Sequence, residues 1–344
     1  MNPENNRIKL RGWIEKRGEV FFRDDLIKIY QDNPEFLPEW LSDCGGEFCL
    51  EWNGCSARDY MGIIPGRRDA GKIFCNEKET GIIKPNLPIL SVKEAVTESV
   101  RLRAEYLPPG KKAVVAFSGG VDSALIAKLA GLPAVTVGLK GSHDLKHAEE
   151  VADIAGISGV ELVEIEKDEI KPALKKVLKV IPEKTPVEAS IAATMYFVTR
   201  WAGENGYERV LAGQGADELF GGYARYLETD NIKETLNRDF RSLSRQGLRD
   251  QSVAEMNGVY LSCPYLDMRV VRAAQSLPPE TLITDGIRKY PLRVAASAHM
   301  PNEAAFYAKK AMQYGSGIWK EIQRQARQYG YKNSVQQYLE HLIV

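Results

Sequence analysis

Glycines, serines and a carboxylate are concentrated at residues 118–123, which read SGGVDS and follow the apolar run AVVAF. Backbone N–H groups of a Gly-Gly turn at the start of a helix form an anion site, and the helix dipole strengthens it. A Walker loop would require a lysine after its second glycine, and this stretch has none. Asp122 among phosphates is electrostatically favourable only beside a cation. The pattern therefore predicts a phosphate site that also binds Mg²⁺.

A second group of glycines and carboxylates occupies residues 212–226, AGQGADELFGGYARY, directly after the apolar run RVL. In an open parallel sheet, ligands bind at the carboxyl ends of the strands, where the strand order reverses. If that order is 3-2-1-4, the loops after strands one and four flank this crevice, and Asp122 faces Asp217 across it. Alternatively, Asp217 and Glu218 are only the solvated acidic start of a helix.

These loops require a scaffold of alternating strands and helices, which the apolar periodicity predicts. Four strands are expected, at 113–117, 134–139, 160–166 and 209–213. Helical patterns precede and separate them, at 91–107, 124–131, 143–156, 171–181 and 186–206. Continuous apolar strands separated by helices predict an α/β fold with a doubly wound parallel sheet. After Tyr223 the pattern is mostly helical.

The first part of the chain has a different character. It carries short β-like runs (EVFF, GEFCLEW and GKIFC) among glycines and asparagines, and it ends in the proline-bounded stretch KPNLPIL. We therefore expect a small β-rich domain over residues 1–88 and a larger α/β domain over residues 89–344.

The five cysteines (Cys44, Cys49, Cys55, Cys75 and Cys263) are odd in number and have no CxxC spacing, and the stretch MNPENNRIKLRGW has no apolar signal core. These features favour reduced thiols, with Cys49 and Cys75 as small buried apolar residues. A zinc site formed by the first four is the weaker alternative.

The composition limits the classes of partner. The 344 residues are 44% apolar and 27% charged, and 46 basic residues balance 46 acidic ones. No net field attracts the whole molecule to nucleic acid or to a membrane surface. No run approaches the roughly 20 apolar residues that a membrane span needs. We expect a cytoplasmic protein without a membrane partner, and a nucleic-acid partner is disfavoured.

The motifs SGGVDS, AVTVGLKGSHDL and AGQGADELFGGY, in this order, resemble the asparagine synthetase family of pyrophosphatase-loop enzymes over about residues 90–320. The resemblance implies a fold like that of the adenine nucleotide alpha hydrolases, with ATP and Mg²⁺ as cofactors. In that family a substrate carboxylate attacks the α-phosphorus of ATP, and a nitrogen nucleophile then displaces AMP from the acyl-adenylate. The implied partners are a small-molecule carboxylate and ammonia or an amine.

The resemblance also implies roles for individual residues. Adenine would be held by Ala116 and Val137, and the nucleotide would be bordered by Ala212 and Gly213. Pyrophosphate would be bound by Ser118, Gly119, Gly120, Val121, Asp122 and Ser123. Asp122 and Asp217 would be the magnesium ligands.

A third motif, from IRKYPLR to KKAMQYGSG, resembles the family segment that carries an active-site lysine, also found in the β-lactam-forming relatives. Lys309 fits that spacing, with Lys310 as the alternative, and Lys289 and Arg293 would be auxiliary phosphate contacts. A fixed cation at this position stabilises the charge that develops on the α-phosphate and on the acyl oxygen.

The front domain resembles a shrunken relative of the family's glutaminase. Glutamine-using members carry a nucleophilic cysteine as residue 2, whereas this chain has Asn2, and its first cysteine is Cys44. Without that thiol the glutamyl thioester cannot form in the usual way. We therefore expect free ammonia or an amine as the nitrogen donor.

Two further departures concern the expected acceptor pocket. Gln214 replaces a glutamate of the synthetases, and Tyr260 and Ser262 replace a Glu-x-Arg pair before the retained Asp267. The loss of these charges argues against aspartate as the substrate. Tyr260 is then a candidate acid/base group or hydrogen-bond donor, or else an ordinary packed tyrosine.

Two other classes of function compete with an amide-forming ligase. A tRNA-modifying enzyme with the same loop predicts a basic patch and an RNA-binding module, which the balanced charge opposes. A non-catalytic nucleotide-binding scaffold is favoured by the altered Gln214 and opposed by the retained Asp122, Asp217 and Lys309. The sequence leaves both a monomer and a homodimer open.

Overall fold

The computed structural model describes residues 8–229, 231–307 and 315–343. The N-terminal part is an antiparallel sheet in the order β2-β1-β3-β4-β5-β6. Its strands are β1 (Lys9–Lys16), β2 (Glu19–Phe21), β3 (Gly45–Trp52), β4 (Cys55–Arg58), β5 (Lys72–Cys75) and β6 (Lys78–Ile82). Two helices, α1 (Arg23–Asp32) and α2 (Leu37–Leu41), contribute Leu26, Leu37 and Leu41 to a core shared with Ile14 and Phe48.

A five-stranded sheet in the order β11-β10-β7-β8-β9 forms the centre of the larger part, and all its strands are parallel. The strands are β7 (Ala113–Ala116), β8 (Ala134–Leu139), β9 (Val160–Ile165), β10 (Arg209–Leu211) and β11 (Tyr260–Ser262). The first four have the order 3-2-1-4, which is the condition under which Asp122 was expected to face Asp217. The fifth strand, β11, was not predicted, because its residues YLS do not form the continuous apolar run that is typical of a buried parallel strand.

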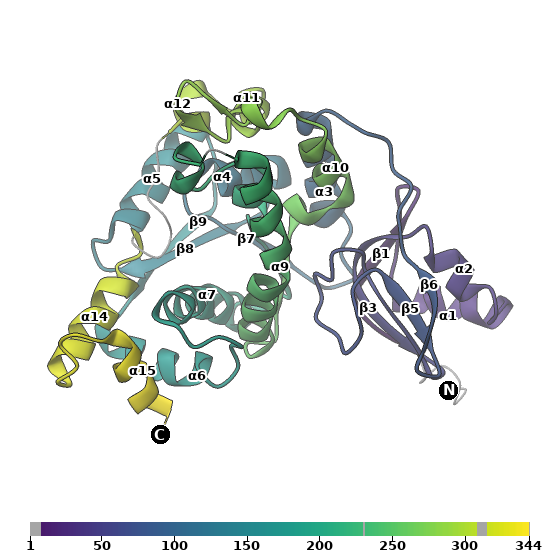
Figure 1. The fold of residues 1–344 in the computed structure, drawn as a ribbon, viewed down its shortest axis with the longest axis horizontal. Helices are drawn as coiled ribbons and strands as arrows, with labels where there is room; N and C mark the ends of the chain where they lie inside the picture. Colours follow the sequence, from purple (N-terminus) through teal and green to yellow (C-terminus); the bar gives the residue numbers. More distant parts are fainter. Residues whose placement is uncertain (1–7, 230, 308–314, 344) are drawn as a thin grey trace.

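Helices cover both faces of this sheet (Figure 1). Alternate side chains of β7 point to opposite faces, so Val114 packs against α6 (Ile170–Val177) and α7 (Pro186–Glu204). Val115 packs on the other face against α4 (Val121–Ala130) and α5 (His143–Ala155). The chain therefore has the predicted doubly wound α/β fold.

The remaining elements lie around this core. Between the two sheets in the chain comes α3 (Val92–Glu105), whose N-terminus is capped by Ser91. Apart from β11, the described C-terminal part consists mainly of helices and one small hairpin. Its elements are α8 (Ala216–Phe220), α9 (Ile232–Glu255), α10 (Met268–Gln275), β12 (Ile283–Thr284), β13 (Ile287–Arg288), α11 (Tyr290–Ser297), α12 (Asn302–Ala305), α14 (Ile318–Gln328) and α15 (Val335–Ile343). Figure 1 shows the N-terminal sheet beside α3 and α10, away from α14 and α15.

A buried ionic network joins the N-terminal sheet to the larger part. Glu47 of β3 accepts hydrogen bonds from Arg103 Nε at 2.8 Å, Ser262 Oγ at 2.6 Å and the backbone N–H of Cys263 at 2.8 Å. Arg103 Nη1 also pairs with Asp267 Oδ2 at 3.0 Å. Glu47 and Arg103 are both fully buried, so this contact fixes the two sheets relative to each other.

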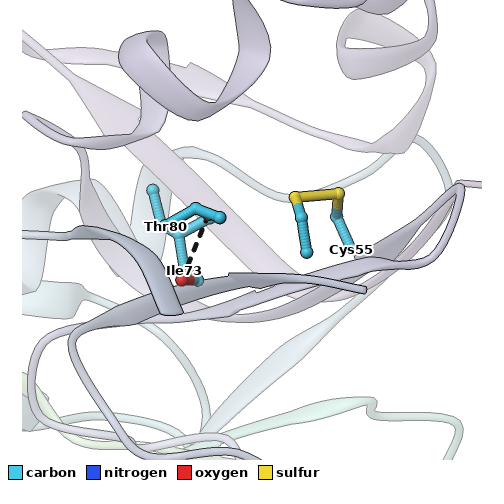
Figure 2. The surroundings of a disulfide bond; sticks show 4 residues. Cys55, Ile73 and Thr80 are labelled. Atoms are coloured by element: carbon cyan, nitrogen blue, oxygen red, sulfur yellow. Dashed lines mark hydrogen bonds between the residues drawn. A yellow bond between two sulfur atoms is a disulfide. The ribbon is translucent and has the colours of Figure 1, made fainter. Parts of the chain in front are cut away.

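The expectation of reduced thiols is wrong for two of the five cysteines. Cys55 and Cys75 form a disulfide (Figure 2), because β4 and β5 pair antiparallel with these residues directly opposite each other. Cys44, Cys49 and Cys263 are free and buried, as a small apolar residue would be. The zinc alternative fails as well, because the described residues contain no cluster of three or more His, Cys, Asp or Glu side chains that could hold a metal.

No helix within the described ranges has both the length and the hydrophobicity that a membrane crossing requires.

Candidate nucleotide site

The predicted phosphate loop (residues 118–123), called the phosphate loop below, follows β7 and leads into α4. Hydrogen bonds of its two serines join its ends. Ser118 N–H donates to Ser123 Oγ at 3.1 Å, and the two hydroxyl oxygens lie 3.0 Å apart. Ser123 Oγ in turn donates to the carbonyl of Gly120 at 3.1 Å. The serines thus determine the shape of the loop and place two hydroxyl groups beside its N–H groups.

The two glycines of the loop differ in their structural roles. Gly119 has φ +72°, and a Cβ there would lie 2.7 Å from Cδ2 of the buried His147. Gly120 is the N-cap of α4, and no side chain of the described residues caps this helix. The first N–H groups of α4 therefore remain available to an anion, as the sequence pattern predicts.

The loop after β10 lies directly against the phosphate loop. A Cβ on Gly213 would lie 3.3 Å from Cβ of Asp122, so a larger side chain would crowd the contact. Gly215, at φ +89°, is the N-cap of α8, and Asp217 lies in the first turn of that helix. The backbone carbonyl of Asp122 accepts a hydrogen bond from the Tyr265 hydroxyl at 2.9 Å. The two motifs are thus adjacent at the carboxyl ends of neighbouring strands.

Lys289 bridges the two predicted metal ligands. Its Nζ lies 2.5 Å from Asp122 Oδ2 and 2.8 Å from Asp217 Oδ1. A Cβ on Gly222 would collide with Asp217 Oδ1 and with Lys289 Cε, so glycine is required beside this pair. Burial alone would lower the pKa of Lys289, but the two carboxylates outweigh it and raise that pKa to about 12.

The left-handed backbone of Lys289 could not have been read from the sequence. This residue is the N-cap of α11 and has φ +57°, a conformation that non-glycine residues rarely adopt. The structure therefore gives Lys289 a central place, where the sequence suggested an auxiliary phosphate contact. Arg293, the other auxiliary candidate, donates to the carbonyls of Arg288, Ala305 and Tyr307.

The donor chemistry of this site suits Mg²⁺. Asp122 and Asp217 both reach one small cationic group, and Mg²⁺ is typically bound by one or two carboxylates together with phosphate oxygens.

The predicted adenine contacts lie on neighbouring strands. Ala116 ends β7 and pairs in register with Val135 of β8, two residues before Val137. Ala212 follows β10, and its N–H donates to the carbonyl of Ser262 at 2.9 Å. Lys309 and its alternative Lys310 lie outside the described residues.

Gln214 has an unexpected partner on α9. Its Nε2 donates to Asp250 Oδ2 at 3.1 Å, and Asp250 is only 2% exposed. Arg249 Nε donates to Asp250 Oδ1 at 2.7 Å, and Arg249 Nη1 also pairs with Glu188 at 2.9 Å. A carboxylate thus lies beside the residue that replaces the family's glutamate. Arg249 and Asp250 lie within a polar helix, and nothing in the sequence marks Asp250 as a partner of Gln214.

Tyr260 is not brought together with the other predicted residues. It is the first residue of β11, opposite Arg209 at the start of β10, whereas the phosphate loop follows the end of β7. Its hydroxyl accepts a hydrogen bond from Arg209 Nε. Ser262 contacts Glu47 of the N-terminal sheet, and Asp267 contacts Arg103. The motif that was expected in the acceptor pocket therefore lies at the interface between the two sheets.

Comparison with known proteins identifies the family of the chain. The sequence profile of the asparagine synthase family matches residues 91–255 and 229–341. The chain is 35% identical over 269 residues to a putative glutamine-hydrolysing asparagine synthetase of Methanocaldococcus jannaschii, covering 65% of this chain and 50% of that protein. It is 27% identical over 360 residues to the glutamine-hydrolysing asparagine synthetase B of Escherichia coli, covering 85% and 64%.

The chain therefore spans about half to just under two thirds of the length of these relatives. Among solved structures, an NMN synthetase from Francisella tularensis is 15% identical with a TM-score of 0.28, covering 65% of this chain and 99% of that one. Because the family profile matches well over half of the sequence and both of its signature loops lie together in the fold, the chain belongs to the asparagine synthase family.

Proposed function

We propose that this chain is an ATP-dependent ligase that forms an amide bond through an acyl-adenylate. A substrate carboxylate attacks the α-phosphorus of ATP and releases pyrophosphate, and ammonia or an amine then displaces AMP. One observation carries the proposal: Asp122 and Asp217, in the first turns of the helices that follow two neighbouring strands, both contact the ammonium group of Lys289. This contact lies beside the N-terminus of α4, which no described side chain caps.

The residues of the chain suit the binding of a polyphosphate. The N–H groups at the start of α4 and the hydroxyls of Ser118 and Ser123 are donors for the β- and γ-phosphates. Lys289 adds a positive charge, which its raised pKa keeps in place at neutral pH. Together they would hold the leaving pyrophosphate and expose the α-phosphorus.

Asp122 and Asp217 would hold Mg²⁺, which when bound neutralises charge on the leaving pyrophosphate. The ammonium group of Lys289 is then free to pair with a phosphate oxygen in place of one carboxylate. Both aspartates would orient the phosphates relative to the acceptor.

The nitrogen source is proposed to be ammonia or an amine. Of the five cysteines in the chain, two form the disulfide and three are buried. Burial raises the pKa of Cys44 to about 12, in spite of Lys16, and raises that of Cys263 well above its usual value. A buried thiol that stays protonated is not a nucleophile, so glutamine hydrolysis by this chain is disfavoured.

The acceptor is proposed to be a carboxylate other than aspartate. The neutral Gln214 replaces a carboxylate of the family, and its amide N–H groups face Asp250. That orientation leaves the Gln214 carbonyl oxygen as the group available to a substrate, which favours an N–H or O–H donor there.

Pyrophosphate exchange into ATP tests the proposal. With Mg²⁺, wild-type protein and a panel of amino and hydroxy carboxylates including aspartate, we expect exchange with at least one acid and without any nitrogen donor. Asp122→Asn should abolish this exchange and keep the fold. If ATP binds but no acid supports exchange, the non-catalytic scaffold is the correct interpretation.

A further inference from the structure

A cavity of about 500 Å³ lies between the N-terminal sheet and the larger part of the chain. It is located where β10 and β11 begin, whereas the phosphate loop follows the end of the neighbouring strand β7. Most of its wall is apolar, from side chains such as Leu10, Phe22, Ile64, Leu107 and Val259. The proposed chemistry does not use this cavity.

Arg209 lines the cavity although only 2% of it is exposed. Its Nε donates to the Tyr260 hydroxyl, and Nη1 donates to the carbonyls of Arg103 at 2.7 Å and Tyr106 at 3.0 Å. A guanidinium has five N–H groups, so the two on Nη2 remain. They make no hydrogen bond to any described residue, and Arg209 forms no ion pair within the same ranges.

A buried guanidinium without a carboxylate is unusual, because the cost of desolvating a charge is offset mainly by a counter-ion. Glu47 is a carboxylate whose charge reaches this region, since, in addition to burial, it raises the pKa of Tyr260. However, Glu47 is already paired with Arg103 and does not serve as the counter-ion of Arg209. Arg209 therefore remains able to bind an anion that enters the cavity.

Tyr260 supplies a second donor in the same cavity. Its oxygen accepts the hydrogen bond from Arg209, so its own proton remains to be donated. Burial raises the pKa of Tyr260 to about 12, although Arg209 acts to lower it, so the hydroxyl stays protonated at neutral pH.

The other charges on the wall leave the cavity positive. The three acidic residues that line it are each paired with a basic one: Glu208 with Lys111, Glu255 with Arg11 and Asp24 with Arg23. Lys112 also lines the cavity and forms no ion pair in the described part of the chain. The acidic residues at the rim are thus neutralised locally, whereas Lys112 and Arg209 are not.

We infer that this interdomain cavity binds a small organic carboxylate with an apolar body. The carboxylate is recognised by Arg209 Nη2, the Tyr260 hydroxyl and the charge of Lys112, and the apolar body lies against the apolar wall. Because the ligand contacts both sheets, its binding stabilises their contact. This site is separate from the nucleotide site and does not depend on its activity.

The test is isothermal titration of the whole chain with 4-phenylbutyrate. Its neutral isostere 4-phenylbutyramide tests the need for charge, and acetate tests the need for an apolar body. We expect 4-phenylbutyrate to bind and both controls to bind at least tenfold more weakly, since hydrogen bonds to a charged group are worth about a factor of ten or more. Saturating Mg-ATP should not displace it.

Variants locate the site. Tyr260→Phe and Lys112→Gln should each weaken binding several-fold, and Tyr329→Phe, at a half-exposed tyrosine outside the cavity wall, should not. These variants are preferred to Arg209→Gln, which also loses two contacts to backbone carbonyls. The inference is overturned if 4-phenylbutyrate does not bind at millimolar concentration, if the amide binds equally, if Mg-ATP competes, or if both cavity variants bind like wild type.

Discussion

Glu47 Oε1 lies 2.8 Å from Arg103 Nε, and both side chains are fully buried between the N-terminal sheet and α3. The Glu47 carboxylate also accepts a hydrogen bond from the Ser262 hydroxyl. The backbone carbonyl of Ser262 in turn accepts a hydrogen bond from the N–H of Ala212. Two hydrogen bonds thus connect the N-terminal sheet to the predicted border of the nucleotide site.

Glu47→Gln should lower the free energy of unfolding by about 3–5 kcal/mol, the usual effect of removing one partner from a buried ion pair. The amide leaves Arg103 without half of its counter-charge, and its single oxygen cannot accept all four of the hydrogen bonds that the Glu47 carboxylate accepts, including the one from Trp13. Urea unfolding measures the change. Glu51→Gln, at an exposed position on the same strand, is the matched control and should change stability by less than about 0.5 kcal/mol. Equal stability of the two variants would contradict the importance of the network.

Lys289→Gln should reduce pyrophosphate exchange by about 100-fold, a typical loss when a preorganised charge is removed. Lys146→Gln, an exposed lysine on α5, should leave the rate unchanged. Similar rates for both variants would mean that Lys289 is only a structural counter-ion of Asp122 and Asp217.

Lys289 also gives an alkaline limit to stability. Its pKa in the folded chain is about 12, above the usual 10.5, because of the two carboxylates. The folded state therefore retains this proton more tightly, and the stabilisation is complete below about pH 10.5 and lost as the pH rises through about 12. Unfolding free energies measured from about pH 9 to about pH 12 should fall more steeply for wild type than for Lys289→Gln.

Gln214→Glu should destabilise the chain by about 1–3 kcal/mol, because a second carboxylate would lie close to Asp250 Oδ2, where Gln214 Nε2 now lies 3.1 Å away. The control is the double variant that combines Gln214→Glu with Asp250→Asn. Removal of the Asp250 charge should recover most of the stability that Gln214→Glu loses. Thermal unfolding of the two single variants and the double variant measures this coupling. Additive losses would show that the two side chains do not interact.

Asp59 should make the N-terminal sheet less stable above about pH 6. Burial raises the pKa of this carboxyl from 3.8 to about 6, although it accepts backbone N–H groups from Phe48 and Ile63. The folded state then binds the proton more tightly than the unfolded state. Stability that is complete below about pH 4 is lost as the pH rises through about 6, by about 3 kcal/mol at most. Unfolding between pH 4 and 7 should show this slope in wild type and not in Asp59→Asn.

Reduction of the Cys55–Cys75 disulfide should destabilise the N-terminal sheet by about 3 kcal/mol, the effect expected for closing a loop of some 20 residues. The Cys55→Ser/Cys75→Ser variant should unfold at the same urea concentration with and without reductant. An unchanged wild-type midpoint in reductant, with free thiols verified, would contradict the prediction.

The sequence by itself determined the four main strands and the two loops at their carboxyl ends, whereas the order of the strands came from the structure. Each of these features is local: an apolar run, a glycine turn or a helical period identifies it without reference to the rest of the chain. The predicted proximity of Asp122 and Asp217 followed because parallel strands end at one edge of their sheet. In the structure both carboxylates contact the ammonium group of Lys289, which agrees with the predicted proximity.

Only the tertiary structure decided which distant residues complete the site. Lys289 reaches Asp122 across 167 residues of sequence, and Ser262 reaches Glu47 across 215. Tyr260 is the first residue of the three-residue strand β11, so it lies at the opposite end of the sheet from the loops that follow the strands. The motif around Tyr260 does not show at which end of the sheet this residue lies. The pairing of Cys55 with Cys75 likewise depends on the register of β4 against β5. Register and long-range packing depend on how whole elements fit together, and no local pattern encodes them.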